Sequence, residues 1–167
     1  NAPGPVMEVA PWIDARFENE EDILARLDAQ THRRSVKSHT PADGIPWYPD
    51  ASYIVVGRDG RDACMSFMNH MAHMRPDLTM ELAGSAQADG IEFGAGGFPD
   101  AEDPHAFFQF FLESPMWFEH VASFWSHRGE PNVLFVHFDD MKADLEGEMR
   151  RVAQFLEIEI DDARWPE

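Results

Sequence analysis

Apolar residues follow two different rhythms along the chain, and these separate short extended runs from amphipathic helices. Continuous apolar, largely β-branched runs occupy 53–57, reading YIVVG, and 132–138, reading NVLFVHF. Such runs are typical of strands that are buried on both faces of a parallel sheet. Residues 33–37, reading RRSVK, are a candidate for a further short strand.

Helical periodicity fills most of the remaining sequence. Apolar residues recur at spacings of three and four, and this predicts helices over 20–30, 60–74, 105–113, 115–128 and 145–156. Asp59 is placed to cap the helix at 60–74, and 139–144 begins as a polar turn. The order of these elements predicts an α/β fold, a parallel β-sheet flanked by helices.

One long segment fits neither rhythm. Residues 75–104 contain the sequence GAGG, three prolines and scattered acidic residues. A loop of this length inside a compact domain is typically a lid or a binding loop, so we expect a flexible loop or lid here. The chain, residues 1–167, is otherwise of a size and composition that fits a single domain.

Charge narrows the classes of partner. The formal net charge is −18, so the chain as a whole repels nucleic acid and anionic membranes, and we expect neither as a partner. A small anionic ligand remains compatible wherever basic residues cluster. With one cysteine, no signal peptide and no apolar run long enough to span a bilayer, the sequence predicts a cytoplasmic protein without a disulfide framework.

The first candidate for chemistry is Lys37-Ser38-His39, at the end of the candidate strand at 33–37. In an extended chain residues two apart point the same way, so Lys37 and His39 can face one cleft. A neutral imidazole can accept a proton near neutral pH, and an ammonium group can hold an anion that is being transferred. The alternative is a solvated surface pair.

The second candidate joins the 53–57 strand to the helix that follows. Arg58 closes the strand, the free N–H groups of the helix amino terminus come next, and Ser66 lies further along the helix. An arginine fork with a hydroxyl suits a phosphate group. The alternative is that Arg58 pairs with Asp59 or Asp62.

A metal centre is not expected. The eight histidines are dispersed, and although His70 and His73 share one helix face, no third ligand is evident.

Three segments, taken together and in order, resemble the family of sulfotransferases that use 3′-phosphoadenosine 5′-phosphosulfate (PAPS). They read RSVKSHTP, YIVVGRDGRDACMSFMNH and VLFVHFDDMKADLEGEMRRVAQFLEI. The family shows K-[ST]-H-x-P after one strand and an arginine with a serine eight positions later after the next. It then shows an acidic pair leading from a later strand into a helix. Each motif alone is modest, whereas the ordered trio is specific.

The resemblance implies part of a P-loop-nucleotide-kinase-like sulfotransferase fold, with PAPS as co-substrate and adenosine 3′,5′-bisphosphate (PAP) as product. The acceptor would be a hydroxyl of a small molecule. His39 matches the base that deprotonates the acceptor, and Lys37 matches a lysine that stabilises the sulfuryl group. Arg58 and Ser66 match the pair that binds the 3′-phosphate. Phe138 lies where many members carry a tyrosine near the adenine.

Two further family motifs have no match, namely the P-K-[ST]-G-like phosphosulfate loop and the R-K-G-x-x-G segment. A parallel sheet without its first strand would expose an edge, so we expect the printed sequence to be part of a longer protein. A chain natively this short would have poor PAPS affinity.

Two other functions stay open. A nucleotide-dependent phosphotransferase would need a Walker loop and a magnesium-binding acid, and neither is visible. A non-catalytic module would bind PAP or a partner protein without turnover. The identity of the acceptor and the formation of a homodimer are also open.

Overall fold

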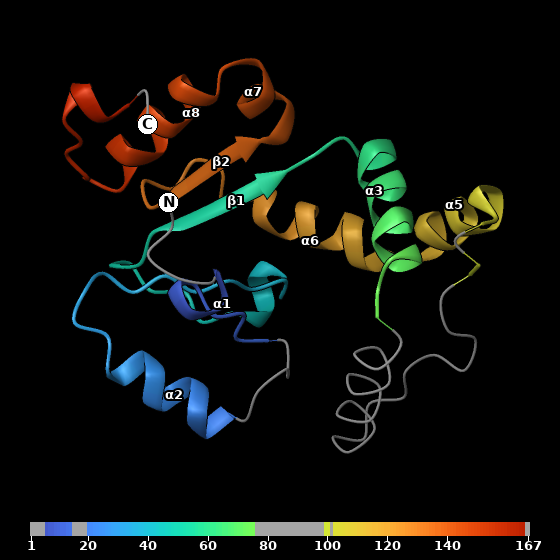
Figure 1. The fold of residues 1–167 in the computed structure, drawn as a ribbon, viewed down its shortest axis with the longest axis horizontal. Helices are drawn as coiled ribbons and strands as arrows, with labels where there is room; N and C mark the ends of the chain where they lie inside the picture. The colour runs from blue at the N-terminus through green and yellow to red at the C-terminus, as the bar shows by residue number, and fades with distance from the viewer. Residues whose placement is uncertain (1–5, 15–19, 76–98, 101, 166–167) are drawn as a thin grey trace.

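The computed structural model describes residues 6–14, 20–75, 99–100 and 102–165. The described helices and strands, in chain order, are α1 (Val6–Val9), α2 (Glu20–Asp28), η1 (Ala42–Gly44), β1 (Tyr53–Gly57), α3 (Gly60–Ala72), α5 (Pro104–Glu113), α6 (Pro115–Trp125), β2 (Val133–His137), α7 (Phe138–Ala143), α8 (Leu145–Phe155) and η2 (Asp162–Arg164). Figure 1 shows β1 and β2 side by side between α6 and the α7–α8 pair.

The two strands pair in parallel, from Tyr53 opposite Val133 to Gly57 opposite His137. The predicted strand at 53–57 is confirmed at both ends, and the one predicted at 132–138 is one residue shorter at each end. The chain passes from β1 to β2 through α3, α5 and α6. The protein is therefore an α/β protein with a parallel sheet, as its sequence predicts.

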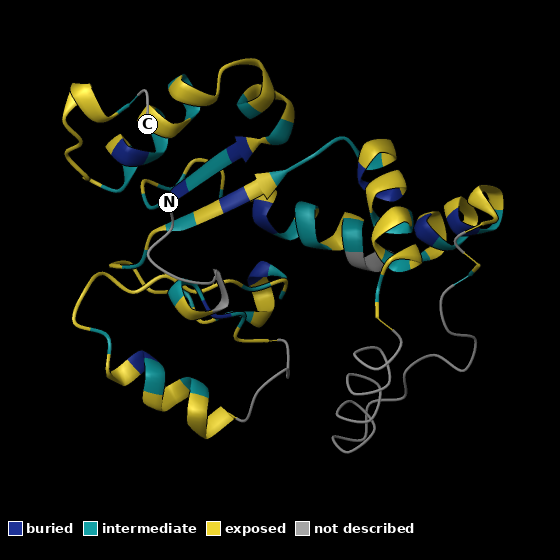
Figure 2. Ribbon diagram, in the orientation of Figure 1, coloured by how far each residue is buried: buried dark blue, intermediate teal, exposed yellow. Residues whose placement is uncertain are grey.

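Burial of β1 on both faces was predicted and is wrong for the part of the chain that the structure describes. Val55 is buried against Val133 and Phe124, whereas Ile54 and Val56 are 39% and 57% exposed. Alternate residues of a strand face opposite sides, so the exposed pair shares one face. Figure 2 shows the resulting alternation along β1, with exposed positions between the buried and half-buried ones.

The predicted strand at 33–37 is also wrong, because only one isolated parallel bridge forms, between Trp12 and Lys37. The backbone N–H of Lys37 donates to Pro11 O at 2.9 Å, and Ile13 N–H donates to Lys37 O at 3.0 Å. Pro11 has no N–H with which to extend the ladder backwards. The next donor forwards, the N–H of His39, bonds the Asp14 side chain instead.

The helices largely follow the prediction, with ends that differ from it by at most three residues. Asp59 caps α3 as expected, because its Oδ1 accepts the backbone N–H of Arg61 at 2.9 Å and of Asp62 at 3.4 Å. The polar turn predicted at 139–144 is wrong, since α7 occupies it. Acidic residues in its first turn and Lys142 in its last complement the helix dipole, which favours helix over turn.

Helix α6 connects two hydrophobic clusters. Its Phe124 is buried with Val55 and Val133 beneath the sheet. Its Trp117 packs against the second cluster, which α3 and α5 build from Ala63, Cys64, Phe107 and Phe111. The strand ends and the α3–α5 pair are therefore held in place by one helix. Among the described residues, no helix is both long and apolar enough to cross a membrane.

Candidate functional site

Two of the predicted nucleotide-binding residues meet at the carboxyl edge of the sheet. Gly57 and His137 are paired in the ladder, so the residues that follow them, Arg58 and Phe138, leave the sheet side by side. The guanidinium carbon of Arg58 lies 4.3 Å from the centroid of the Phe138 ring. Lys142 Nζ lies 5.7 Å from the same centroid. Two cations therefore flank one aromatic face in an otherwise acidic protein.

Arg58 is also paired with an acid, which is the alternative that the sequence left open. Its Nε lies 2.6 Å and its Nη2 2.5 Å from Asp62 Oδ2, one turn into α3. The side chain of Arg58 is 28% exposed, so an arriving anion can still reach it. Ser66 lies on an exposed part of α3, and none of the described contacts joins it to Arg58.

The two predicted catalytic residues meet on a single indole. Lys37 Nζ lies 4.4 Å from the centroid of the Trp12 ring. The His39 ring lies 4.5 Å from the same residue's ring, edge to face at 64°. Both side chains thus lie against Trp12.

The turn that carries His39 is held by Asp14. Asp14 Oδ2 accepts the backbone N–H of His39 at 2.7 Å, the hydroxyl of Thr40 at 3.0 Å and that of Ser38 at 3.2 Å. Burial alone would raise the pKa of Asp14, but these hydrogen bonds, that of His39 first, outweigh it and lower the pKa. The carboxylate is therefore ionised near neutral pH.

The surroundings of His39 lower the pKa of its imidazole and so favour the neutral form. Partial desolvation lowers its pKa most, the ammonium of Lys37 lowers it next, and His120 contributes in the same direction. The negative charge of Asp14 opposes them without reversing the net shift. A neutral imidazole beside an ammonium can accept a proton from a hydroxyl while the ammonium faces an anion.

Helix α6 lies against the loop that follows His39 and against the start of α3. His120 acts electrostatically on His39, and Ser123 Oγ accepts the backbone N–H of Ala42, in the loop after His39, at 2.9 Å. One turn earlier, the indole nitrogen of Trp117 lies 3.8 Å from where a Cβ on Gly60 would stand. Trp117 and His120 are three residues apart and so share a helix face. One face of α6 therefore faces the start of α3 and the His39 turn together.

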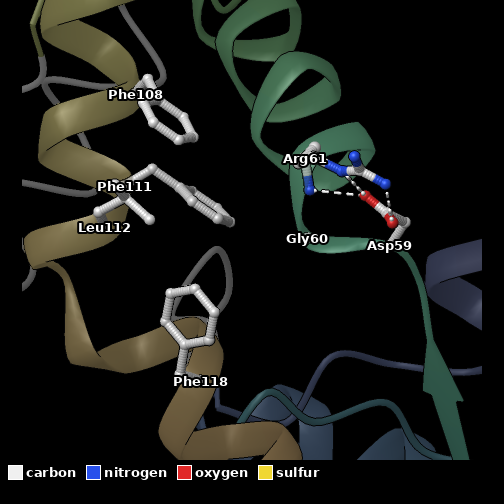
Figure 3. Close-up of a pocket in the computed structure, with 7 residues that line it drawn as sticks. All are labelled: Asp59, Gly60, Arg61, Phe108, Phe111, Leu112 and Phe118. Atoms are coloured by element: carbon white, nitrogen blue, oxygen red, sulfur yellow. Dashed lines mark hydrogen bonds and ion pairs between the residues drawn. The ribbon is translucent and has the colours of Figure 1, made fainter.

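A cavity of about 200 Å³ opens beside the start of α3. It is lined by Asp59, Gly60, Arg61, Phe108, Phe111, Leu112 and Phe118. Figure 3 shows the three phenylalanines and the leucine on one side, with the Asp59–Arg61 turn opposite. Neighbouring aromatic residues of α5 therefore differ in role. Phe107 is fully buried in the core, whereas Phe108 is 40% exposed and lines the cavity.

Sequence reasoning missed Trp12, Asp14 and His120. The first two lie beside a proline-rich entry segment that carries no periodic signal, and they contact His39 through tertiary interactions. His120 lies in an aromatic helix whose pattern indicates packing alone. Nothing in their spacing pointed to the site.

Two other predictions from the sequence concern a lid and a metal site. Most of the predicted lid, 75–104, lies outside them. Among the residues that are described, no three His, Cys, Asp or Glu side chains gather as metal ligands would.

Comparison with known proteins supplies the family. A family model for the sulfotransferase domain matches residues 3–165. A glycolipid sulfotransferase of Mycobacterium tuberculosis (strain ATCC 25177 / H37Ra) is 36% identical, over 93% of this chain and 54% of the relative. Human sulfotransferase 1E1 is 28% identical, over 88% of this chain and 45% of its own length. The chain thus spans about half the length of these relatives.

Solved structures agree on the fold. Mouse sulfotransferase SULT7A1 complexed with PAP superposes with a TM-score of 0.67 at 21% identity, over 89% of this chain and 48% of that one. Retinol dehydratase in complex with androsterone and PAP gives a TM-score of 0.62 at 24% identity, over 89% and 39%. The match of the family model over nearly the whole sequence shows that this chain belongs to the sulfotransferase domain family.

Proposed function

We propose that this chain provides the proton-accepting and 3′-phosphate-binding parts of a PAPS-dependent sulfotransferase that acts on a hydroxyl of a small molecule. The observation that carries the proposal is that α6 adjoins two places: the loop after His39, where Ser123 accepts a hydrogen bond from Ala42, and the start of α3, directly after Arg58. A nucleotide held at Arg58 would then direct its sulfuryl group toward His39.

The reaction is an in-line displacement at sulfur. His39 accepts the proton of the acceptor hydroxyl, whose oxygen forms a bond to sulfur. The bond between sulfur and the oxygen of the 5′-phosphate breaks, and that oxygen leaves with PAP. Lys37, close to the same indole as His39, stabilises negative charge on the sulfuryl and bridging oxygens. Most of the catalysis is positioning and charge stabilisation, as in phosphoryl transfer.

The nucleotide end of the site rests on Arg58, Ser66 and Phe138. The guanidinium stacks on the Phe138 ring, which restricts its motion, and its Nε and Nη2 atoms are paired with Asp62. The 3′-phosphate would replace Asp62 as the partner of the Arg58 guanidinium or bind it together with Asp62. The hydroxyl of Ser66 would be a further hydrogen-bond donor to the phosphate. Phe138 offers adenine an apolar contact but no hydroxyl.

The acceptor site is proposed to have an apolar wall. Phe108, Phe118 and Leu112 are between 40% and 48% exposed and surround the cavity beside Arg61. Exposed aromatic side chains around a hollow favour an acceptor with a hydrophobic portion. The name of the mycobacterial relative, a glycolipid sulfotransferase, is consistent with such an acceptor.

Calorimetry with PAP beside a turnover assay with PAPS tests the proposal. We expect saturable PAP binding and transfer of labelled sulfate to a hydroxyl acceptor. Binding without transfer would instead select the non-catalytic module, and absence of binding would overturn both sulfotransferase functions. A cytoplasmic location remains a prediction of the sequence, and the formation of a homodimer remains open.

A further inference from the structure

We infer that Asp14 is a positioning residue for His39, one that fixes the turn carrying the imidazole and places a negative charge near the ring. The inference rests on the proposed function, because it concerns the same proton acceptor. Asp14 lies next to the isolated bridge between Trp12 and Lys37, and in the sequence it stands outside every motif of the family resemblance.

The carboxylate of Asp14 joins its own segment to residues 38–40, and we call this set of hydrogen bonds the clasp. A single oxygen, Asp14 Oδ2, gathers one backbone N–H and two hydroxyls from three consecutive residues, Ser38, His39 and Thr40. Ser38 Oγ in turn accepts the backbone N–H of Thr40 at 3.0 Å, which closes the turn on itself. All the hydrogen bonds that reach this carboxylate from residues 38–40 therefore restrain the backbone on which His39 stands.

The clasp also explains why pairing stops at Lys37. In a continued parallel ladder the N–H of His39 would donate to the carbonyl of Ile13. The carboxylate of Asp14 takes this donor at 2.7 Å, so the chain turns away after the bridge. The turn leaves the His39 ring edge-on to Trp12 instead of in register with a neighbouring strand.

The charge of Asp14 acts in the opposite direction to the other groups that face His39. These groups are Lys37 on the same segment and His120 on α6, and both favour the neutral ring, as does burial. Asp14 favours the protonated ring and thereby limits how far its basicity falls. A base that were too weakly basic would be a poorer proton acceptor.

Two substitutions separate the clasp from the charge. Asp14→Asn keeps an oxygen of nearly the same size for the donors and removes the negative charge, whereas Asp14→Ala removes both. Asp43→Asn is the matched control, because Asp43 is an exposed acid in η1 of the same loop. Each variant is made in the protein as encoded, and far-ultraviolet circular dichroism checks its fold.

The first readout is the titration of His39 by NMR of the imidazole C–H signals, which needs no turnover. Asp14→Asn should lower the pKa of His39 while Asp43→Asn leaves it unchanged. The second readout is the pH profile of kcat/KM for PAPS. Its acidic limb should move to lower pH in Asp14→Asn, and kcat should fall about tenfold or more in Asp14→Ala.

The outcomes of the two readouts are distinguishable. If the wild-type protein transfers no sulfate, the proposed function fails, while the titration still decides what Asp14 does to His39. If the wild-type protein is active and His39 titrates identically in Asp14→Asn and the wild type, the inference about Asp14 is overturned and the proposed function stands.

Discussion

The guanidinium carbon of Arg58 lies 4.3 Å from the centroid of the Phe138 ring, although 80 positions separate the two residues in the sequence. The contact follows from the register of the sheet, because the residues just before them, Gly57 and His137, are paired. Parallel pairing brings the carboxyl ends of both strands to one edge, where ligands of open α/β sheets bind.

Arg58→Ala should weaken the binding of PAPS more than it slows transfer. Loss of a charged hydrogen bond to phosphate costs about 1.5–3 kcal/mol, so the KM for PAPS should rise by roughly 10- to 100-fold. Arg128→Ala is a matched control, since Arg128 also stacks on an aromatic ring, at 5.0 Å from Trp125. Steady-state kinetics decide the matter, and equal KM values in the two variants would refute the 3′-phosphate role.

His39→Ala should remove the proton acceptor without removing the nucleotide site. General base catalysis contributes about 10²- to 10⁴-fold, so turnover should fall by at least about 10²-fold. PAP affinity, measured by calorimetry, should change little. His32→Ala, which changes an exposed histidine elsewhere in the chain, should keep wild-type turnover. Near-wild-type turnover in His39→Ala would exclude this histidine as the base.

The pH dependence of the wild-type protein follows from the lowered pKa of His39. A base must be unprotonated to act, so kcat/KM should fall as the pH drops through the pKa of His39. Because partial burial and Lys37 lower that pKa, the midpoint should lie below the ordinary histidine value of about 6.5. A pH profile from 4.5 to 8 measures it, and a midpoint above that value would contradict the described surroundings of His39.

Stability should depend on Phe107 far more than on its neighbour. Phe107 is fully buried between α3 and α5, so Phe107→Ala should lower the free energy of unfolding by about 3–5 kcal/mol. Phe108→Ala is the matched control, because Phe108 is 40% exposed and lines the cavity. Urea unfolding followed by tryptophan fluorescence compares the two, and similar losses would show that the burial is misassigned.

Much of the fold was predictable because local patterns coincide with tertiary roles. The run YIVVG is a strand at its predicted positions, and Asp59 caps α3 by its own side chain. The run at 33–37 failed for a non-local reason, since its partner begins with a proline and its next donor bonds Asp14. Exposure of Ile54 and Val56 depends on which elements cover the sheet, which a strand pattern does not encode.

Only the site residues that belong to a sequence motif were predictable from the sequence. Lys37 and His39 were selected by their spacing and by family resemblance, and both contact Trp12. Trp12 itself, Asp14 and His120 reach the site through tertiary contacts that leave no periodic trace. The sequence allows either a free Arg58 guanidinium or an ion pair with a nearby acid, and the ion pair with Asp62 forms.

We propose that a nucleotide bound at position 58 reaches the imidazole at position 39. Titration of PAP into protein with ¹³C-labelled histidines, in the wild type and in Arg58→Ala, measures this link. We expect the His39 signal to shift saturably with PAP and the variant to need about tenfold or more PAP for the same shift. If the His39 signal stays unmoved while calorimetry shows saturated PAP binding, the nucleotide and the imidazole do not share one site.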